Sequence, residues 1–377
     1  MEFLSEYGLF LAKTVTVVVG LLVIVGALVS ARHRRQAPGK GEIQVTNIGD
    51  DIKSLANAIH HEVMTKAEYK HFHKQEKQQE KAEEKRRKAA LKKAPSRAEA
   101  KSEADTGHDM PATQSAAAES GDKQPPKRIY VLDFDGDVKA SEVESLREEI
   151  TAIIAASREG DEVLLRLESP GGMVHTYGLA ASQLRRLRQH GLKLTVAVDE
   201  VAASGGYMMA CVADEILAAP FAVLGSIGVV AEVPNFHRLL EKANVDYELH
   251  TAGEYKRTLT MFGENSPRAR QKFREELDET HDLFKAFIRE NRPQLDVESV
   301  ATGEHWYGVQ ALSRGLVDKI QTSDDFLLKA SEEAEIFGVE YDIRKPLAER
   351  LSVSLQEGVD RLLMKWWQRG SNPGLYK

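Results

Sequence analysis

The chain has 377 residues, 42% of them hydrophobic, and a formal net charge of −7. This length allows one large domain with appendages or two domains, and the composition is typical of a protein that buries a core. The negative net charge gives no reason to expect a nucleic acid as a partner. The single cysteine, Cys211, excludes an internal disulfide framework and a cysteine-based metal site, and its apolar neighbours indicate a small buried residue.

Residues Leu9 to Val29 form a nearly continuous apolar run that is interrupted only by Lys13. About 20 apolar residues are enough to span a bilayer as a helix. A cleaved signal peptide fits less well, because Glu2 and Glu6 stand where basic residues are expected before the apolar run. We therefore expect an uncleaved, single-pass membrane anchor in residues 1–35.

A basic cluster directly after this run bears on the orientation of the anchor. It consists of Arg32, His33, Arg34 and Arg35. Positive residues favour the cytoplasmic side of a membrane, so the cluster favours a cytoplasmic location for the rest of the chain. The same rule predicts the orientation of long domains poorly, and the sequence leaves the side of the membrane open.

Residues 36–93 are expected to form a charged helical region. Its apolar side chains recur at helical spacing in one stripe, which consists of Ile52, Leu55, Ile59, Val63 and Ala67. From Lys74 to Lys93 the composition is typical of a solvent-exposed helix with many i,i+4 charge pairs. The histidines of this region lack carboxylates at a fixed spacing, so we expect no metal site there; they are His60, His61, His71 and His73. Residues 94–127 have the composition of a disordered linker.

The globular core is expected over residues 128–346. Apolar and β-branched segments predict strands at 129–134, 162–167 and 192–198. The intervening segments predict helices at 141–157 and 175–189. Strands and helices that alternate at this spacing indicate right-handed βαβ units and a parallel sheet, so we expect an α/β fold.

Two turns in this core are candidates for a ligand site. Ser204 lies where the strand 192–198 leads, through small residues, to an apolar helix whose free N–H groups would stabilise an oxyanion. The turn Ser169-Pro170-Gly171-Gly172 follows the strand 162–167 and exposes backbone amides. Both turns are expected at one edge of the sheet, the usual place for ligands in α/β folds. The amide of Gly171 or Gly172, paired with that of Gly205, is a candidate oxyanion hole. A small-residue packing face is the alternative explanation of the sequence around Ser204.

A serine nucleophile needs a base, and three downstream residues are candidates. His237 or His250 could complete a Ser-His-Asp triad, although neither lies in a distinctive turn. Lys256 precedes apolar residues, and a lysine acts as a base only where desolvation keeps it neutral. On composition alone, a solvated surface charge is the default explanation of Lys256. The choice of base stays open at this point.

Four motifs, in this order, resemble the signal peptide peptidase A family. They are Ser169-Pro170-Gly171-Gly172, Ala202-Ala203-Ser204-Gly205-Gly206-Tyr207, Gly225-Ser226-Ile227-Gly228-Val229 and Gly253-Glu254-Tyr255-Lys256. The similarity extends through residues 301–312 and 315–318, so that it covers residues 129–329. One anchor, a charged N-terminal region and a single catalytic core most resemble the SohB-type branch of this family.

The resemblance implies a Clp/crotonase-like fold, which is a parallel-sheet βαβ spiral, and the activity of a membrane-bound Ser–Lys endopeptidase. It makes Ser204 the nucleophile, Lys256 its general base, and Ser226 a hydrogen-bonding residue that orients Lys256. It requires no metal and no organic cofactor. A simple turn serine is the alternative explanation of Ser226.

The resemblance also implies partners and a location. Members of the family form dome-like homo-oligomers that admit extended or unfolded peptides, such as remnant signal peptides or unfolded envelope proteins. They lie in the bacterial inner membrane with a periplasmic catalytic domain, whereas the cluster at 32–35 favours the cytoplasm. Residues 347–377 predict an amphipathic helix, either for a subunit contact or membrane surface, or for plain core packing.

Three other functions remain as alternatives. A protease with a Ser-His-Asp triad differs only in its base. A crotonase-type acyl-CoA enzyme would share the sheet and the oxyanion glycines, but it needs neither a serine at the helix start nor a membrane anchor. A non-catalytic membrane scaffold that acts through residues 48–93 would not need Ser204, Lys256 and the glycine turns together.

Overall fold

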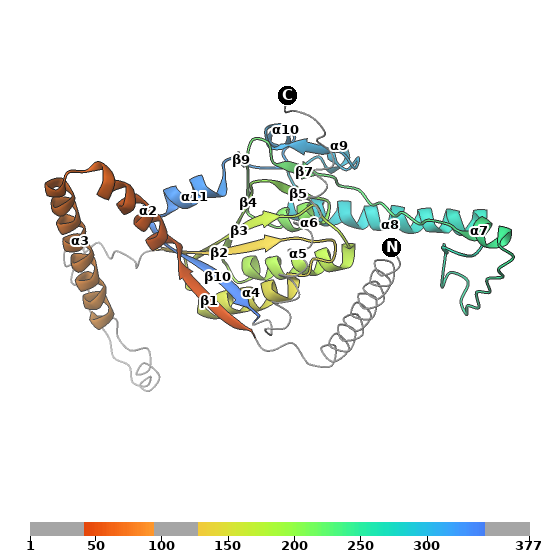
Figure 1. Cartoon of the computed structure of the whole chain (residues 1–377), viewed down its shortest axis with the longest axis horizontal. Helices are drawn as coiled ribbons and strands as arrows, with labels where there is room; N and C mark the ends of the chain where they lie inside the picture. Colours follow the sequence, from red (N-terminus) through yellow and green to blue (C-terminus); the bar gives the residue numbers. More distant parts are fainter. Residues whose placement is uncertain (1–40, 94–126, 344–377) are drawn as a thin grey trace, which may run out of the picture. The chain divides into compact units, whose positions relative to one another are not determined.

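The computed structural model of the chain describes residues 41–93 and 127–343 (Figure 1). Residues 45–340 belong to one compact unit, which contains all of the expected site residues. The few described residues outside it belong to a second unit, in which the Gly41 amide donates to the Tyr341 hydroxyl at 2.8 Å.

Three predicted segments lie outside the described residues. They are the anchor (1–35), all but the last residue of the linker (94–127) and the C-terminal helix (347–377). Among the helices in the described ranges, none has the length and apolar character needed to cross a membrane.

A seven-stranded sheet forms the centre of the fold. Its strands lie in the order β1-β10-β2-β3-β4-β6-β9. Each neighbouring pair from β10 to β9 is parallel. The strands are β1 (Glu42–Asn47), β2 (Lys127–Asp135), β3 (Glu162–Glu168), β4 (Lys193–Val198), β6 (Glu215–Ala218), β9 (Lys319–Ile320) and β10 (Ala334–Asp342). The predicted α/β fold with a parallel sheet is confirmed.

Both faces of this sheet are buried. Successive side chains of a strand point to opposite faces. In β2, Tyr130 and Leu132 therefore join the larger hydrophobic cluster, whereas Ile129 and Val131 join a smaller cluster on the other face. Strands that are buried on both sides have nearly continuous apolar sequences, which is why they were recognisable in the sequence.

Helices cover each face. The larger cluster includes residues of α4 (Val143–Ala156), α5 (Val174–Gln189) and α8 (Pro267–Asn291). The smaller cluster includes residues packed from α2 (Ile48–Val63) and α11 (Ser323–Ala330). Helices α4 and α5 lie where the sequence predicted them, with ends shifted by two residues at most. The short helices are α6 (Gly205–Ala210), α7 (His237–Lys242), α9 (Val297–Val300) and α10 (Gly308–Ser313).

A second, three-stranded sheet was not predicted. It contains β5 (Val201–Ala203), β7 (Val223–Gly225) and β8 (His305–Tyr307), with β5 and β7 parallel and β8 antiparallel to β7. The turn from β4 to β5 is fixed by Asp199, whose carboxylate accepts hydrogen bonds from the Ser323 amide (2.9 Å) and hydroxyl (2.5 Å). The small residues between the strand 192–198 and Ser204 form β5, so that Ser204 lies between a strand and a helix, as the sequence predicts.

The charged N-terminal region contains a strand and two helices. Asn47 caps α2, since its side chain accepts a hydrogen bond from the Asp50 amide. Helix α3 (Lys66–Lys93) follows after a two-residue break. The predicted apolar stripe is divided: Ile52 packs against the smaller cluster, whereas its continuation is exposed and consists of Leu55, Ile59 and Val63.

A buried ion pair joins the end of α8 to the sheet. Arg292 is only 3% exposed, and its guanidinium donates to both carboxylate oxygens of Asp318 at 2.7 and 2.8 Å. Asp318 also accepts a hydrogen bond from the Ile216 amide (2.7 Å) in β6. Burial alone raises the pKa of Asp318, but the hydrogen bonds from Arg292 and Ile216 outweigh it and hold that pKa below its usual value.

We predict that Asp318→Asn lowers the free energy of unfolding by about 3 kcal/mol at pH 7, because it leaves Arg292 buried without a counter-charge. The folded-state pKa of Asp318 is depressed, so its contribution is present above the unfolded pKa of about 4 and is lost as the pH falls through the folded pKa. Denaturant unfolding from pH 3 to 7 should therefore show the difference between wild type and variant shrinking towards low pH. A matched control is Asp282→Asn, because the Asp282 carboxylate is exposed in its ion pair with Lys285. An equal effect of both variants would contradict the prediction.

Candidate active site

Ser204 has a strained backbone between β5 and α6. Its φ of 52° and ψ of −116° are those of the first central residue of a type II′ turn, a position that favours glycine. Such a conformation costs on the order of 1–3 kcal/mol in a non-glycine residue. Hydrogen bonds maintain it: the Ser204 amide donates to Gly225 (2.8 Å), and its carbonyl accepts from Met208 (3.0 Å). A strained serine in a strand-to-helix turn is the arrangement of a nucleophile elbow, and Ser204 is partly exposed.

The turn that follows β3 lies directly against Ser204. The Ser169 amide donates to the carbonyl of Val201 (2.8 Å), and the Ala203 amide donates to that of Ser169 (3.0 Å). At the other end of the turn, the Met173 amide donates to the carbonyl of Val138 (2.9 Å). The structure therefore brings together the two turns that the sequence singled out.

The contact between these turns requires glycine. Gly171 has a φ of 88°, and a Cβ there would lie 2.7 Å from the Gly205 nitrogen and 2.8 Å from the Ser204 Cβ. A Cβ on Gly206 would lie 2.5 Å from the Ser169 carbonyl oxygen. Because no side chain separates them, the two turns pack backbone against backbone.

The three candidate oxyanion amides differ in their hydrogen bonding. The Gly171 amide donates to the Ser169 hydroxyl at 3.1 Å. For the amides of Gly172 and Gly205, the described residues provide no hydrogen-bond acceptor. Two backbone donors beside Ser204 are therefore free to bind a negatively charged oxygen.

Ser226 occupies the position next to Ser204 on the neighbouring strand. The parallel register pairs Ala203 with Gly225, so that Ser204 and Ser226 each follow a paired residue. Ser226 also has a positive φ, of 50°, and its amide donates to the carbonyl of Glu304 (2.6 Å). Ser226 is partly exposed, like Ser204.

Lys256 lies in an exposed loop between α7 and α8. Its amide donates to the Gly253 carbonyl at 3.2 Å, and its side chain is exposed to solvent. Within the described ranges, no hydrogen bond or ion pair joins that side chain to another residue. The structure thus brings Ser204 and Ser226 together but does not join Lys256 to either.

The histidines weighed as alternative bases are engaged elsewhere. His237 pairs with Glu241 one turn along α7 (3.5 Å), and His250 pairs with Glu248 (3.3 Å). A third histidine, His305, was not among the bases considered in the sequence, but strand pairing places it beside the turn that contains Ser226. β8 pairs His305 with Gly225, the residue before Ser226. A strand of three residues leaves no periodic pattern that could have indicated this placement.

Acidic residues lie at the carboxyl ends of three strands of the seven-stranded sheet. Glu168 ends β3 directly before the turn at Ser169, Asp135 ends β2, and Glu200 follows β4. Burial, together with the negative charges of Glu200 and Asp135, raises the pKa of Glu168.

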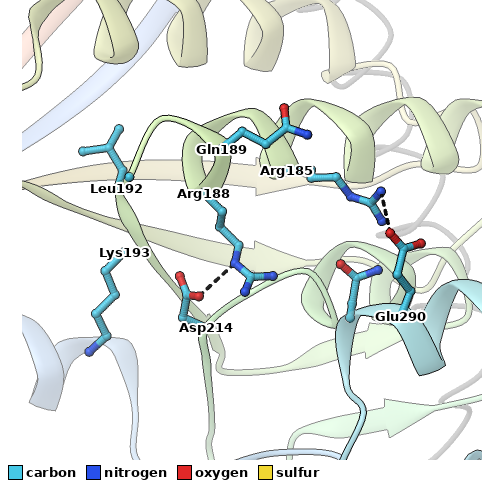
Figure 2. A pocket seen from close by; sticks show the side chains of 9 residues that line it. Arg185, Arg188, Gln189, Leu192, Lys193, Asp214 and Glu290 are labelled. Carbon is cyan, nitrogen blue, oxygen red and sulfur yellow. Dashed lines mark hydrogen bonds and ion pairs between the residues drawn. The ribbon is translucent and has the colours of Figure 1, made fainter.

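A cavity of about 760 Å³ lies at the opposite, amino end of the strands (Figure 2). Its lining includes Arg185 and Arg188 of α5, which form ion pairs with Glu290 (3.1 Å) and Asp214 (2.8 Å). None of the expected site residues lines it. Because ligands of parallel α/β sheets bind at the carboxyl ends of the strands, we do not assign the active site to this cavity.

The fold and the two turns define a class of protein. Two neighbouring strands that end in a strained serine and in a turn with a free backbone amide are the framework of a serine hydrolase. Residues 2–184 match the family model described as peptidase family S49 N-terminal, and residues 186–336 match peptidase family S49.

Relatives agree with this match. The chain is 44% identical over 375 residues to a probable protease SohB of Haemophilus influenzae, covering 100% of this chain and 99% of the relative. It is 59% identical over 239 residues to a probable protease SohB of Buchnera aphidicola, covering 63% and 71% of the two chains. The chain belongs to peptidase family S49. It is a serine-type peptidase, and the resemblance found in the four motifs is confirmed.

A solved structure is also similar. A mutant of the 1510-N membrane-bound stomatin-specific protease, in complex with a substrate peptide, aligns with a TM-score of 0.39 and 13% sequence identity. The alignment covers 62% of this chain and 100% of that chain.

We predict that Gly171→Ala destabilises the protein more than Gly191→Ala, by about 1–3 kcal/mol in the free energy of unfolding. Both glycines have a positive φ (88° and 80°), so both variants incur the cost of a left-handed alanine, about 1–2 kcal/mol. Only the Cβ at position 171 meets other atoms, whereas a Cβ at position 191 has none within 4 Å. Denaturant unfolding of the two variants measures the difference, and equal losses would refute the backbone contact described above.

Proposed function

We propose that the chain is a membrane-anchored serine endopeptidase in which Ser204 is the nucleophile and Lys256 the general base. The observation that carries the proposal is the strained backbone of Ser204 at a strand-to-helix turn, with two free amides beside it. Backbone strain of this kind persists where the surrounding structure fixes it, and it concentrates at active sites.

The reaction proceeds through an acyl-enzyme. Lys256 Nζ takes the proton of the Ser204 hydroxyl while Ser204 Oγ attacks the carbonyl carbon of the peptide. The resulting ammonium gives this proton to the leaving amine as the tetrahedral intermediate collapses to an ester. Lys256 then takes a proton from water, which attacks the ester, and the proton returns to Ser204 Oγ as the acid product leaves.

The tetrahedral intermediate carries an oxyanion, for which we assign Gly172 and Gly205 as hydrogen-bond donors. Gly171 was an equal candidate in the sequence, but its amide already donates to Ser169. Gly171 serves the site instead by its close backbone approach to Ser204. Removing one oxyanion donor typically lowers kcat by about 10²–10³.

Lys256 must be desolvated to act as a base, because a base has to be neutral. In the exposed loop the lysine is solvated. Docking of the loop against the turns at Ser204 and Ser226 would remove that water. The Ser226 hydroxyl would then accept or donate a hydrogen bond at Lys256 Nζ and orient it. Desolvation and orientation together make a lysine an effective base.

The fold we propose is the Clp/crotonase-like spiral, assembled as a homo-oligomer. Exposed apolar side chains are concentrated in the segment that leads to α8 and includes the Lys256 loop, where solvent exposure of so much apolar surface is unfavourable in a lone subunit. They are Val230, Val233, Phe236, Leu239, Val245, Tyr247, Leu249, Tyr255, Met261 and Phe262. A second copy that covers this segment would bury them and exclude water from Lys256.

The substrates we propose are extended or unfolded peptides, in particular remnants of signal peptides or unfolded membrane and envelope proteins. A single-pass anchor in residues 1–35 would hold the enzyme in the bacterial inner membrane, near these substrates. By family resemblance the catalytic domain is periplasmic, while the basic cluster at 32–35 favours the cytoplasm. Protease accessibility in intact spheroplasts distinguishes the two orientations.

We predict that Ser204→Ala and Lys256→Ala each lower the hydrolysis of a fluorogenic unfolded polypeptide by at least about a thousandfold in the full-length, detergent-solubilised protein. Lys256→Arg keeps the positive charge but cannot act as a base, so it should be equally inactive. The neighbouring cation in the same loop supplies a control, Arg257→Ala, which should retain activity.

The rival Ser-His-Asp triad is tested in the same assay by His237→Ala, His250→Ala and His305→Ala. The Ser–Lys mechanism predicts activity within a few-fold of wild type for all three. Retained activity in Lys256→Ala, combined with loss in one histidine variant, would replace the dyad by a triad.

A further inference from the structure

Ser169 and Tyr177 form a hydrogen-bonded pair beneath the turn at the active site. Neither side chain is exposed to solvent. Ser169 Oγ lies 2.6 Å from Tyr177 Oη, and Tyr177 Oη donates to the backbone carbonyl of Asp137 at 2.8 Å. The Gly171 amide donates to Ser169 Oγ at 3.1 Å. Sequence reasoning missed Tyr177, because an aromatic residue on the apolar face of a helix is explained by core packing alone.

The direction of these hydrogen bonds follows from the number of hydrogens that each hydroxyl can donate. A hydroxyl has one hydrogen, and that of Tyr177 is given to the Asp137 carbonyl. The Ser169 hydroxyl therefore donates to Tyr177 Oη and accepts from the Gly171 amide. Burial raises the pKa of Tyr177, so that its hydroxyl stays protonated and keeps this role. We call this chain, from the Gly171 amide to the Asp137 carbonyl, the Ser169–Tyr177 relay.

Glycines enclose the relay tightly. A Cβ on Gly136, at the end of β2, would overlap both Ser169 Oγ and Tyr177 Oη. A Cβ on Gly205, at the start of α6, would overlap the Tyr177 ring. Because close-packed interiors transmit displacements, the relay cannot shift without moving the residue that follows Ser204.

The relay acts on the residue that contacts the nucleophile. The Gly171 amide is held by Ser169, and a Cβ on Gly171 would overlap Ser204 and Gly205, so the Gly171 backbone lies directly against both. The conformation of Gly171 sets the direction in which the next amide, that of Gly172, points. The free donor at Gly172 thus depends on two side chains that are themselves buried.

We infer that Ser169 and Tyr177 are positioning residues, which orient the oxyanion-binding turn for the reaction at Ser204. The inference rests on the proposed function, since it assumes that the turn binds an oxyanion. Oxyanion binding stabilises the transition state more than the bound substrate. Loss of the relay should therefore lower kcat and leave KM nearly unchanged, which a merely structural role would not do.

The test uses the full-length protein and a matched pair of tyrosines. Tyr177→Phe removes the hydroxyl and leaves the ring packed against Gly205, and Ser169→Ala breaks the relay at its other member. The control is Tyr207→Phe in α6, which removes an equally buried hydroxyl that donates to the Leu316 carbonyl at 2.9 Å and takes no part in the relay. For each variant, kcat and KM on an unfolded polypeptide and the denaturant midpoint are measured.

We expect Tyr177→Phe and Ser169→Ala each to lower kcat by about 10- to 100-fold, because a small misplacement of a catalytic donor has effects of this size. KM should stay within about threefold, as expected when an interaction made in the transition state is lost. The double variant should be no slower than the slower single variant, since both residues act through one chain of hydrogen bonds. Tyr207→Phe should lose comparable stability and keep its kcat.

Equal kcat values for Tyr177→Phe and Tyr207→Phe would overturn the inference and leave the proposed function intact. A wild-type protein without Ser204-dependent hydrolysis would overturn the proposed function, and the relay's role with it. Should Tyr177→Phe fail to fold, Ser169→Ala decides the question by the same kcat criterion.

Discussion

The backbone of Ser204 is held in a conformation that favours glycine, and the hydrogen bonds and contacts that hold it also build the rest of the site. Its amide is bound to Gly225 and its carbonyl to Met208, while Gly171 fills the space beside it. A backbone conformation that costs about 1–3 kcal/mol persists only where several such contacts hold it in place. The result is a serine whose hydroxyl, neighbouring amides and supporting turn form one rigid assembly.

The larger fold supplies the two sides of this assembly. In the seven-stranded sheet β3 ends at Glu168, directly before Ser169, and in the three-stranded sheet β5 ends directly before Ser204; a bridge between Ser169 and Ala202 joins the two sheets. The half of the site that contains Ser204 and the glycine turns is therefore fixed by packing. The other half, at Lys256, lies in an exposed loop. If Lys256 is the base, as we propose, the active state requires this loop to be covered.

Much of this was predictable from the sequence. Fully buried strands and regular helices leave continuous or periodic apolar patterns, so the parallel sheet and helices α4 and α5 were predicted, and the glycine motifs indicated where the turns would meet. Three-residue strands leave no pattern, so β5 and the position of His305 were missed. Tyr177 was missed because its hydroxyl acts through contacts, with Ser169 and Asp137, that only the folded chain creates. Lys256 lies in an exposed loop without regular secondary structure, which leaves no pattern from which its surroundings could be predicted.

The central claim is that Ser204 is the nucleophile, and covalent labelling tests it most directly. Purified full-length protein is treated with a fluorophosphonate, digested, and mapped by mass spectrometry. The account predicts one adduct on the peptide that contains Ser204, absent in Ser204→Ala and strongly reduced in Lys256→Ala, whose serine lacks its base. An adduct on a different serine, or labelling that persists in Ser204→Ala, would contradict it.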